Sequence, residues 1–211
     1  MARLFAARPA NDLPKVPNFN ICPTNDMHVV SLGEAGRQIT AMRWGFLPHW
    51  YKSPSDGPLL INARAETIAE KPAFRAACRE RRCLIPATGF YEWTKDAEGR
   101  RLPWYISRSD DQPLALAGIW QGWGKGDGLR NSCAVVTTGA NSAMSAIHHR
   151  MPVILEPADW PLWLGEAGKG AARLMRAAPE DALRWWRVDP KVNSNRAEGP
   201  DLIDPLDTGD E

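Results

Sequence analysis

The chain of 211 residues contains few cysteines, and none of them has the spacing of a metal ligand. There is no Cys-x-x-Cys pair, and no cysteine and histidine residues cluster at the spacing that zinc sites use. We therefore expect reduced thiols, as in a cytosolic protein, and no metal site. The four cysteines are Cys22, Cys78, Cys83 and Cys133.

Long apolar runs and an excess of one charge are also absent. No stretch approaches the roughly 18 apolar residues of a membrane-spanning helix. The apolar start, MARLFAARPAND, is too short for the core of a signal peptide. The formal net charge is only +1, so the overall electrostatic field of the protein does not by itself indicate a nucleic-acid partner. We expect a soluble, cytoplasmic protein in which any DNA binding depends on a local patch.

Tyrosine and phenylalanine are scarce, with three and five residues, whereas the chain has ten tryptophans. Large rings usually pack in the core and at its rim, and we expect this for most of the tryptophans. A few of them could instead stack on exposed bases of a nucleic acid.

Proline and glycine divide the chain into many short elements, as in a β-rich domain. Residues 28–32 and 38–46 are predicted to form a hairpin. Helices are predicted over 71–82, over 157–164 and as two short segments across 171–186. The start, MARLFAAR, has the pattern of a short amphipathic helix. Further strands are predicted for RCLIPATGFYEWTK, LPWYISR, PLALAGIWQGW and SCAVVTT.

This mixed order of elements favours the α+β class over a doubly wound fold. We expect one domain over residues 1–211, with a mostly antiparallel, strongly curved, half-barrel-like sheet and a few flanking helices. The acidic end, about residues 200–211, is expected to fray. We expect the protein to be a monomer.

Four segments each set a polar or charged residue among apolar or aromatic ones where a strand should meet a loop. Single motifs of this kind carry little information, but four in a fixed order are specific. The segments are FNICPT, LLINARAET, LIPATGFYEWTK and TTGANSAMSAIHHRMPVIL. In this order they closely resemble the SOS-response-associated peptidase (SRAP) family, from about Asn18 to the VNSN segment at 192–195.

In LLINARAET, Asn62 and Arg64 share one face of an extended segment because side chains alternate along a strand. An asparagine there can orient a hydroxyl or carbonyl, and an arginine can hold a phosphate. Alternatively, the two satisfy local backbone and lie on a solvated face. The resemblance implies that Asn62 is catalytic and that Arg64 binds DNA.

In GFYEWTK, Glu92 alternates with Tyr91 and Trp93 and projects to the same side as Phe90. A carboxylate among rings loses hydration and becomes a candidate general acid or base. The alternative is a strand-end glutamate with its head in water. The resemblance implies that Glu92 is the catalytic carboxylate, and Trp93 is a candidate base-stacking wall.

In AIHHRMPVIL, His148 lies between a loop of small residues and an apolar strand. A histidine can pass protons near neutral pH, and Arg150 can bind phosphate. A loop histidine with no activating neighbour in sequence is more often without a chemical role. The IHxRMP pattern implies that His148 is the family's catalytic histidine, whereas His149 falls where the family varies.

The chain departs from the family at its start. Members begin Met-Cys-Gly-Arg and lose the methionine, after which the cysteine amine and thiol close a thiazolidine ring on the aldehyde of an abasic sugar. Here residue 2 is alanine, so the chain is either an inactive relative or has a misplaced start. We expect the second, with the cysteine upstream of Met1. Cys22 cannot replace it because an internal residue has no α-amine.

The resemblance implies a protein that recognises abasic sites in single-stranded DNA, at a junction with duplex, without metal or organic cofactor. With a native N-terminal cysteine it would form a covalent crosslink that shields the lesion. One alternative is a peptidase that acts on itself, with His148 as base. The other is a non-catalytic single-stranded-DNA-binding relative.

Overall fold

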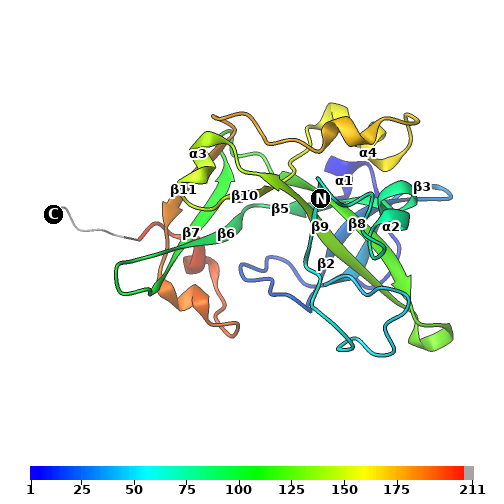
Figure 1. Ribbon diagram of the computed structural model, residues 1–211, viewed down its shortest axis with the longest axis horizontal. Helices are drawn as coiled ribbons and strands as arrows, with labels where there is room; N and C mark the ends of the chain where they lie inside the picture. The colour runs from blue at the N-terminus through cyan, green and yellow to red at the C-terminus, as the bar shows by residue number, and fades with distance from the viewer. Residues whose placement is uncertain (207–211) are drawn as a thin grey trace.

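A computed structural model describes residues 1–206, which form two β-sheets with short helices around them (Figure 1). The strands are β1 (Arg8–Pro9), β2 (Asp26–Gly33), β3 (Gly36–Trp44), β4 (Asn62–Arg64), β5 (Arg82–Ala87), β6 (Phe90–Lys95), β7 (Arg101–Arg108), β8 (Leu114–Trp123), β9 (Arg130–Gly139), β10 (Arg150–Pro152) and β11 (Leu183–Arg187). The helices are α1 (Ala2–Phe5), α2 (Arg75–Glu80), α3 (Ser142–Ser145) and α4 (Trp160–Leu164), with 3₁₀ turns η1 (Gly126–Gly128), η2 (Pro157–Asp159), η3 (Ala171–Leu174), η4 (Pro190–Asn193) and η5 (Pro200–Ile203).

The larger sheet is mostly antiparallel and closes on itself. Strands β3, β2, β5, β8 and β9 pair antiparallel in that order. A short parallel pairing, Arg43 with Ser132 and Trp44 with Cys133, joins β3 to β9 and completes the ring. The predicted α+β fold with a strongly curved antiparallel sheet is confirmed. Because β3 also pairs with β9, the sheet is closed, whereas a half barrel was expected.

Both faces of the closed sheet are buried. Alternation along β2 sends Met27 and Val29 into one apolar cluster and Val30 into the other. The cluster with Val30 includes Phe5 of α1 and Trp163 of α4, so the short helices cover that face. The cluster with Met27 reaches the second sheet and the segment around α3, which are the parts that carry the candidate site.

The second sheet has the order β11-β7-β6 and is antiparallel throughout. Its β6–β7 hairpin projects away from the closed sheet in Figure 1. Only two residues separate β6 from β5, and one of them is Gly89. A Cβ there would lie 2.3 Å from the Tyr105 ring and 2.5 Å from the Ile106 carbonyl oxygen, so only glycine lets the chain pass so closely. This passage places the β6 side chains beside the closed sheet.

The predicted hairpin is confirmed, with β2 and β3 paired from Asp26 and Arg43 to Gly33 and Gly36. The helix predicted over 71–82 is shorter at both ends, because residues 71–74 form a bend and turns before α2 and strand β5 begins at Arg82. The helix predicted over 157–164 is present as η2 and α4.

One helix prediction was wrong. Of the two short helices expected across 171–186, the first is present as η3, but the second is replaced by strand β11. Five residues of β11 pair with β7, so a partner strand far away in sequence outweighs local helix propensity. The order of the chain continues past residue 200, since Leu202 is fully buried and Leu206 donates a backbone hydrogen bond to Arg187. The remainder of the predicted frayed tail, residues 207–211, lies outside the described residues.

Candidate functional site

Glu92 and His148 meet at the junction of the two sheets. Glu92 extends from β6, and His148 lies between α3 and β10. The His148 Nδ1 atom is 3.6 Å from Glu92 Oε1, and the two side chains are 33% and 25% exposed. The structure therefore brings together two of the three residues predicted to be catalytic.

The pKa of Glu92 is raised above its usual value. Burial is the main cause, because the charged carboxylate loses water, while the nearby charge of His148 and the backbone N–H of Trp93 oppose the shift. A carboxyl group with a raised pKa can hold a proton closer to neutral pH and still release it. Glu92 has the environment of a proton donor and acceptor.

The backbone of Arg150 holds the imidazole of His148 in place. His148 Nδ1 is 3.0 Å from the Arg150 carbonyl oxygen and 3.2 Å from its N–H, so the ring nitrogen donates to one or accepts from the other according to its tautomer. Among residues 1–206, the hydrogen bonds and ion pairs of this ring involve Arg150 and Glu92, with no serine or cysteine. No nucleophile–base pair supports the peptidase alternative in this part of the chain.

The loop before His148 is held by a helix cap. The Asn141 side chain accepts a 2.9 Å hydrogen bond from the Met144 N–H at the start of α3, as an N-cap residue does. Its amide group also donates to the carbonyl oxygens of Ala178 and Pro179, at 3.1 Å each. These contacts fix the position of α3, and therefore the position of His148, which follows it in the chain.

The guanidinium of Arg150 is occupied by the protein itself. It donates to both carboxylate oxygens of Glu66, at 2.8 and 2.9 Å, and to the Thr137 carbonyl oxygen at 2.7 Å. Its hydrogen bonds with Arg150 lower the pKa of Glu66 to about 2. A phosphate would have to compete with Glu66 for Arg150, and the predicted phosphate contact stays a prediction.

Asn62 and Arg64 lie on one exposed face of β4, as alternation predicted, and Ala63 between them is fully buried. Strand β4 runs parallel to β9, with Arg64 opposite Thr137. Arg64 is therefore next to the residue that Arg150 contacts. The catalytic role of Asn62 and the DNA-binding role of Arg64 remain predictions.

Trp93 lies on the face of β6 opposite to Glu92, since the two are neighbours in a strand. Its indole N–H donates to the Asn193 side chain at 2.7 Å, and the Arg101 guanidinium lies 4.4 Å from its ring. The ring is anchored to the VNSN segment, and its role as a base-stacking wall remains a prediction.

The FNICPT loop joins the same cluster. The Tyr91 hydroxyl donates to the Phe19 carbonyl oxygen at 2.8 Å, and the Asn20 amide donates to the carbonyl oxygens of Ser194 and Ala197. Cys22, in this loop, is partly buried, and burial raises the pKa of its thiol. A raised pKa disfavours the thiolate, so Cys22 is a poor nucleophile here.

The motif segments thus converge through a chain of contacts. The segment after β4 reaches Arg150 through Glu66, Arg150 holds His148, and His148 meets Glu92. Our predictions missed Glu66 and Asn193. Glu66 stands two residues after Arg64, so the alternation that groups Asn62 with Arg64 also points to it, and Asn193 lies within the VNSN motif.

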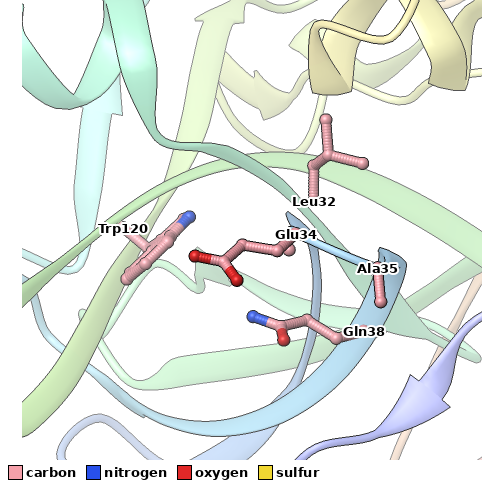
Figure 2. A pocket seen from close by; sticks show the side chains of 6 residues that line it. Leu32, Glu34, Ala35, Gln38 and Trp120 are labelled. Carbon is pink, nitrogen blue, oxygen red and sulfur yellow. The ribbon is translucent and has the colours of Figure 1, made fainter.

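A hollow with a volume of about 770 Å³ lies beside the β2–β3 turn, away from this site. Glu34 and Gln38 face Trp120 across it (Figure 2). It shares no residue with the Glu92–His148 site. Within residues 1–206, no three histidine, cysteine or acidic side chains group as metal ligands. No helix in this range is long and apolar enough to cross a membrane.

Comparisons with known proteins agree on one family. The sequence matches the family described as SOS response associated peptidase (SRAP) over residues 1–195. It is 32% identical to "Abasic site processing protein YoqW" of Bacillus subtilis (strain 168) over 192 residues, which cover 89% of this chain and 86% of that protein. It is 28% identical to "Abasic site processing protein YedK" of Escherichia coli (strain K12) over 212 residues, 96% and 93% of the two chains.

Two crystal structures share the fold. One, of a protein from Bacteroides thetaiotaomicron, superposes with a TM-score of 0.76 at 25% identity and covers 87% of this chain and 82% of its own. The other, of a protein from Bordetella bronchiseptica, has a TM-score of 0.74 at 25% identity and covers 90% and 94%. Sequence and fold agree: the chain belongs to the SOS response associated peptidase (SRAP) family.

Proposed function

We propose that this protein recognises abasic sites in single-stranded DNA, with Glu92 and His148 moving protons at the opened sugar. The main support is the 3.6 Å contact between these two side chains at the place where the motif segments meet. An open abasic sugar carries an aldehyde, whose reaction with an amine requires proton transfer to and from oxygen. The similar proteins named for abasic-site processing support the choice of substrate.

Each residue of the site has a task in this proposal. Glu92, whose pKa is raised by burial, gives a proton to the sugar oxygen that leaves as water when an amine condenses with the aldehyde. His148 takes up the proton that the amine loses. Asn62 orients the sugar, and Arg64 and Arg150 hold the phosphates on either side. DNA with a single-stranded part next to duplex suits this site, because an unpaired abasic nucleotide is free to leave the strand.

Closing a thiazolidine ring requires an N-terminal cysteine, which this sequence lacks at residue 2. The amine would form an imine with loss of water, and the thiol would then add to the imine carbon. An amine without the thiol stops at the reversible imine. We propose that a chain starting at Met1 with alanine at residue 2 recognises the lesion and does not close the ring, whereas one with an N-terminal cysteine does both.

Equilibrium binding tests the proposal. A labelled single-stranded oligonucleotide with one abasic site, made by removing uracil, is compared with the same strand carrying thymine. We expect tighter binding of the abasic strand, and a loss of this preference in an Asn62→Ala variant that keeps its thermal stability, because Asn62 is the residue proposed to orient the sugar. Equal affinity of the unaltered protein for both strands would contradict the proposal.

A further inference from the structure

A row of three side chains crosses the second sheet on the face that carries Glu92. The strand register places Glu92 of β6 opposite Trp104 of β7, and Trp104 opposite Arg187 of β11. Directly paired residues of antiparallel strands share a face, with their Cβ atoms about 5 Å apart. Trp104 is therefore directly opposite Glu92 on the same face, which Phe90 also shares, whereas Trp93 lies on the opposite face.

The indole of Trp104 is held on two sides. Its N–H donates to the Thr94 hydroxyl at 2.9 Å, and the Arg187 guanidinium lies 5.3 Å from its ring. Arg187 is itself fixed by a 3.2 Å hydrogen bond from its Nε to the Pro103 carbonyl oxygen. A ring already held in one orientation loses little freedom when a ligand stacks on it.

This row lies where the apolar core ends. The next row toward the core contains Ile106, which is fully buried, between Phe90 and Trp185. Phe90, Trp185 and Trp104 are all partly buried and all pack against the same cluster. Trp104 and Arg187 keep partial exposure, and so does Leu102, further toward the projecting hairpin of Figure 1. The opposite face of the sheet is closed by a cluster of Tyr105, Val188, Val192 and Leu202.

Arg187 also differs from two other arginines of this sheet. Arg108 forms ion pairs with Asp110 and Glu156, and Arg184 with Asp111. The ion pairs described for residues 1–206 include none to Arg187. A fixed aromatic ring beside such a cation is the pattern of surfaces that bind single-stranded nucleic acid, because every base has a face that stacks and every nucleotide has a phosphate.

We propose that Trp104, Thr94, Leu102 and Arg187 form a second nucleotide subsite next to Glu92. The base of the nucleotide adjacent to the abasic one stacks on Trp104, and its phosphate contacts Arg187. Glu92 and Arg187 are two strand spacings apart, about 10 Å, which suits neighbouring nucleotides of an extended strand. The subsite rests on the proposed function, since its ligand is the single-stranded DNA bound there.

Fluorescence of 2-aminopurine tests the subsite. The base is placed directly 5′ or directly 3′ of the abasic site, and stacking on an indole quenches it. We expect quenching in one of the two positions with the unaltered protein. Trp104→Ala should remove the quenching and weaken binding about tenfold, whereas Trp104→Phe should keep most of the binding. Arg187→Gln should lower the slope of log affinity against log salt by about 0.7.

Trp123→Phe is the matched control. Trp123 lies at the end of β8, where its indole N–H donates to the Tyr51 carbonyl oxygen. Strand β8 belongs to the closed sheet, whereas the subsite is on the second sheet. We expect this variant to behave as the unaltered protein. The melting temperature of every variant is measured. If Trp104→Ala fails to fold, the salt slope of Arg187→Gln decides whether the subsite binds DNA.

The outcomes separate the two proposals. If the unaltered protein prefers abasic DNA but Trp104→Ala and Arg187→Gln bind and quench as it does, the subsite is refuted and the proposed function stands. If Trp93→Ala, rather than Trp104→Ala, removes the quenching, the subsite is also refuted. If the protein does not prefer abasic DNA, the proposed function fails. In that case, weaker binding of undamaged single-stranded DNA by Trp104→Ala would still support a nucleotide-binding surface at Trp104.

Discussion

Arg150 donates two hydrogen bonds to the carboxylate of Glu66, so the cation predicted to grip DNA is already paired within the protein. The carboxylate occupies the place that a phosphate would take, because both present two oxygens to the guanidinium fork. Glu66 is therefore expected both to orient Arg150 and to compete with a phosphate for it.

The first prediction follows from this competition. Glu66→Gln removes the negative charge and should raise the affinity for single-stranded DNA several-fold at low salt, as measured by fluorescence anisotropy. The gain should vanish in the Glu66→Gln, Arg150→Gln double variant. An unchanged or lower affinity in the single variant would mean that Glu66 is needed to position Arg150 and does not compete with DNA.

The second prediction concerns pH. The pKa of Glu66 falls from its ordinary 4.5 to about 2 in the folded protein, so the ion pair stabilises the fold fully above about pH 4.5. This contribution is lost as the pH falls from 4.5 toward 2. The melting temperature of the unaltered protein minus that of Glu66→Gln should therefore be constant near neutral pH and shrink below about 4.5. A difference that stays constant down to pH 3 would argue against the pair.

The third prediction is that Arg64 contacts a phosphate. Arg64→Ala should weaken single-stranded DNA binding and reduce its logarithmic salt slope by about 0.7, the value for one lost phosphate contact. Arg173→Ala, an exposed arginine of η3, should leave the slope unchanged. Equal slopes in Arg64→Ala and the unaltered protein would identify Arg64 as solvated surface.

The fourth prediction is that the chain with alanine at residue 2 forms no heat-stable crosslink to abasic DNA, because no residue of it offers both a free α-amine and a thiol. Denaturing gels after heating, with and without hydroxylamine, provide the measurement. An added Met-Cys-Gly-Arg start should produce the band, and replacing that cysteine with alanine should abolish it. A resistant band from the unaltered chain would overturn this prediction.

The fifth prediction isolates the proton transfer. In the version with the added cysteine, Glu92→Gln should slow crosslinking about 100-fold, since glutamine keeps the size of glutamate but cannot exchange a proton in this step. DNA affinity and melting temperature should change little. A fall in melting temperature together with every activity would show a structural carboxylate instead, and an unaltered rate would remove Glu92 from the mechanism.

Short-range patterns in the sequence were enough to predict several features of the structure. Alternation placed Asn62 and Arg64 on one face of β4, and the break at residues 33–37 marked the β2–β3 hairpin, since both depend on neighbours in the chain. The order of the motifs pointed to the family, which the comparisons then showed.

Only the tertiary structure decided what the site residues contact. Glu92 and His148 are 56 positions apart (148 − 92), and their contact depends on how the second sheet docks on the closed one. The strand register sets Trp104 beside Glu92, and pairing with β7 makes β11 a strand where local propensity favours a helix. Arg150 meets Glu66 because β4 and β10 both border β9. Such contacts arise from hydrogen bonding and burial between distant segments, which no local pattern encodes.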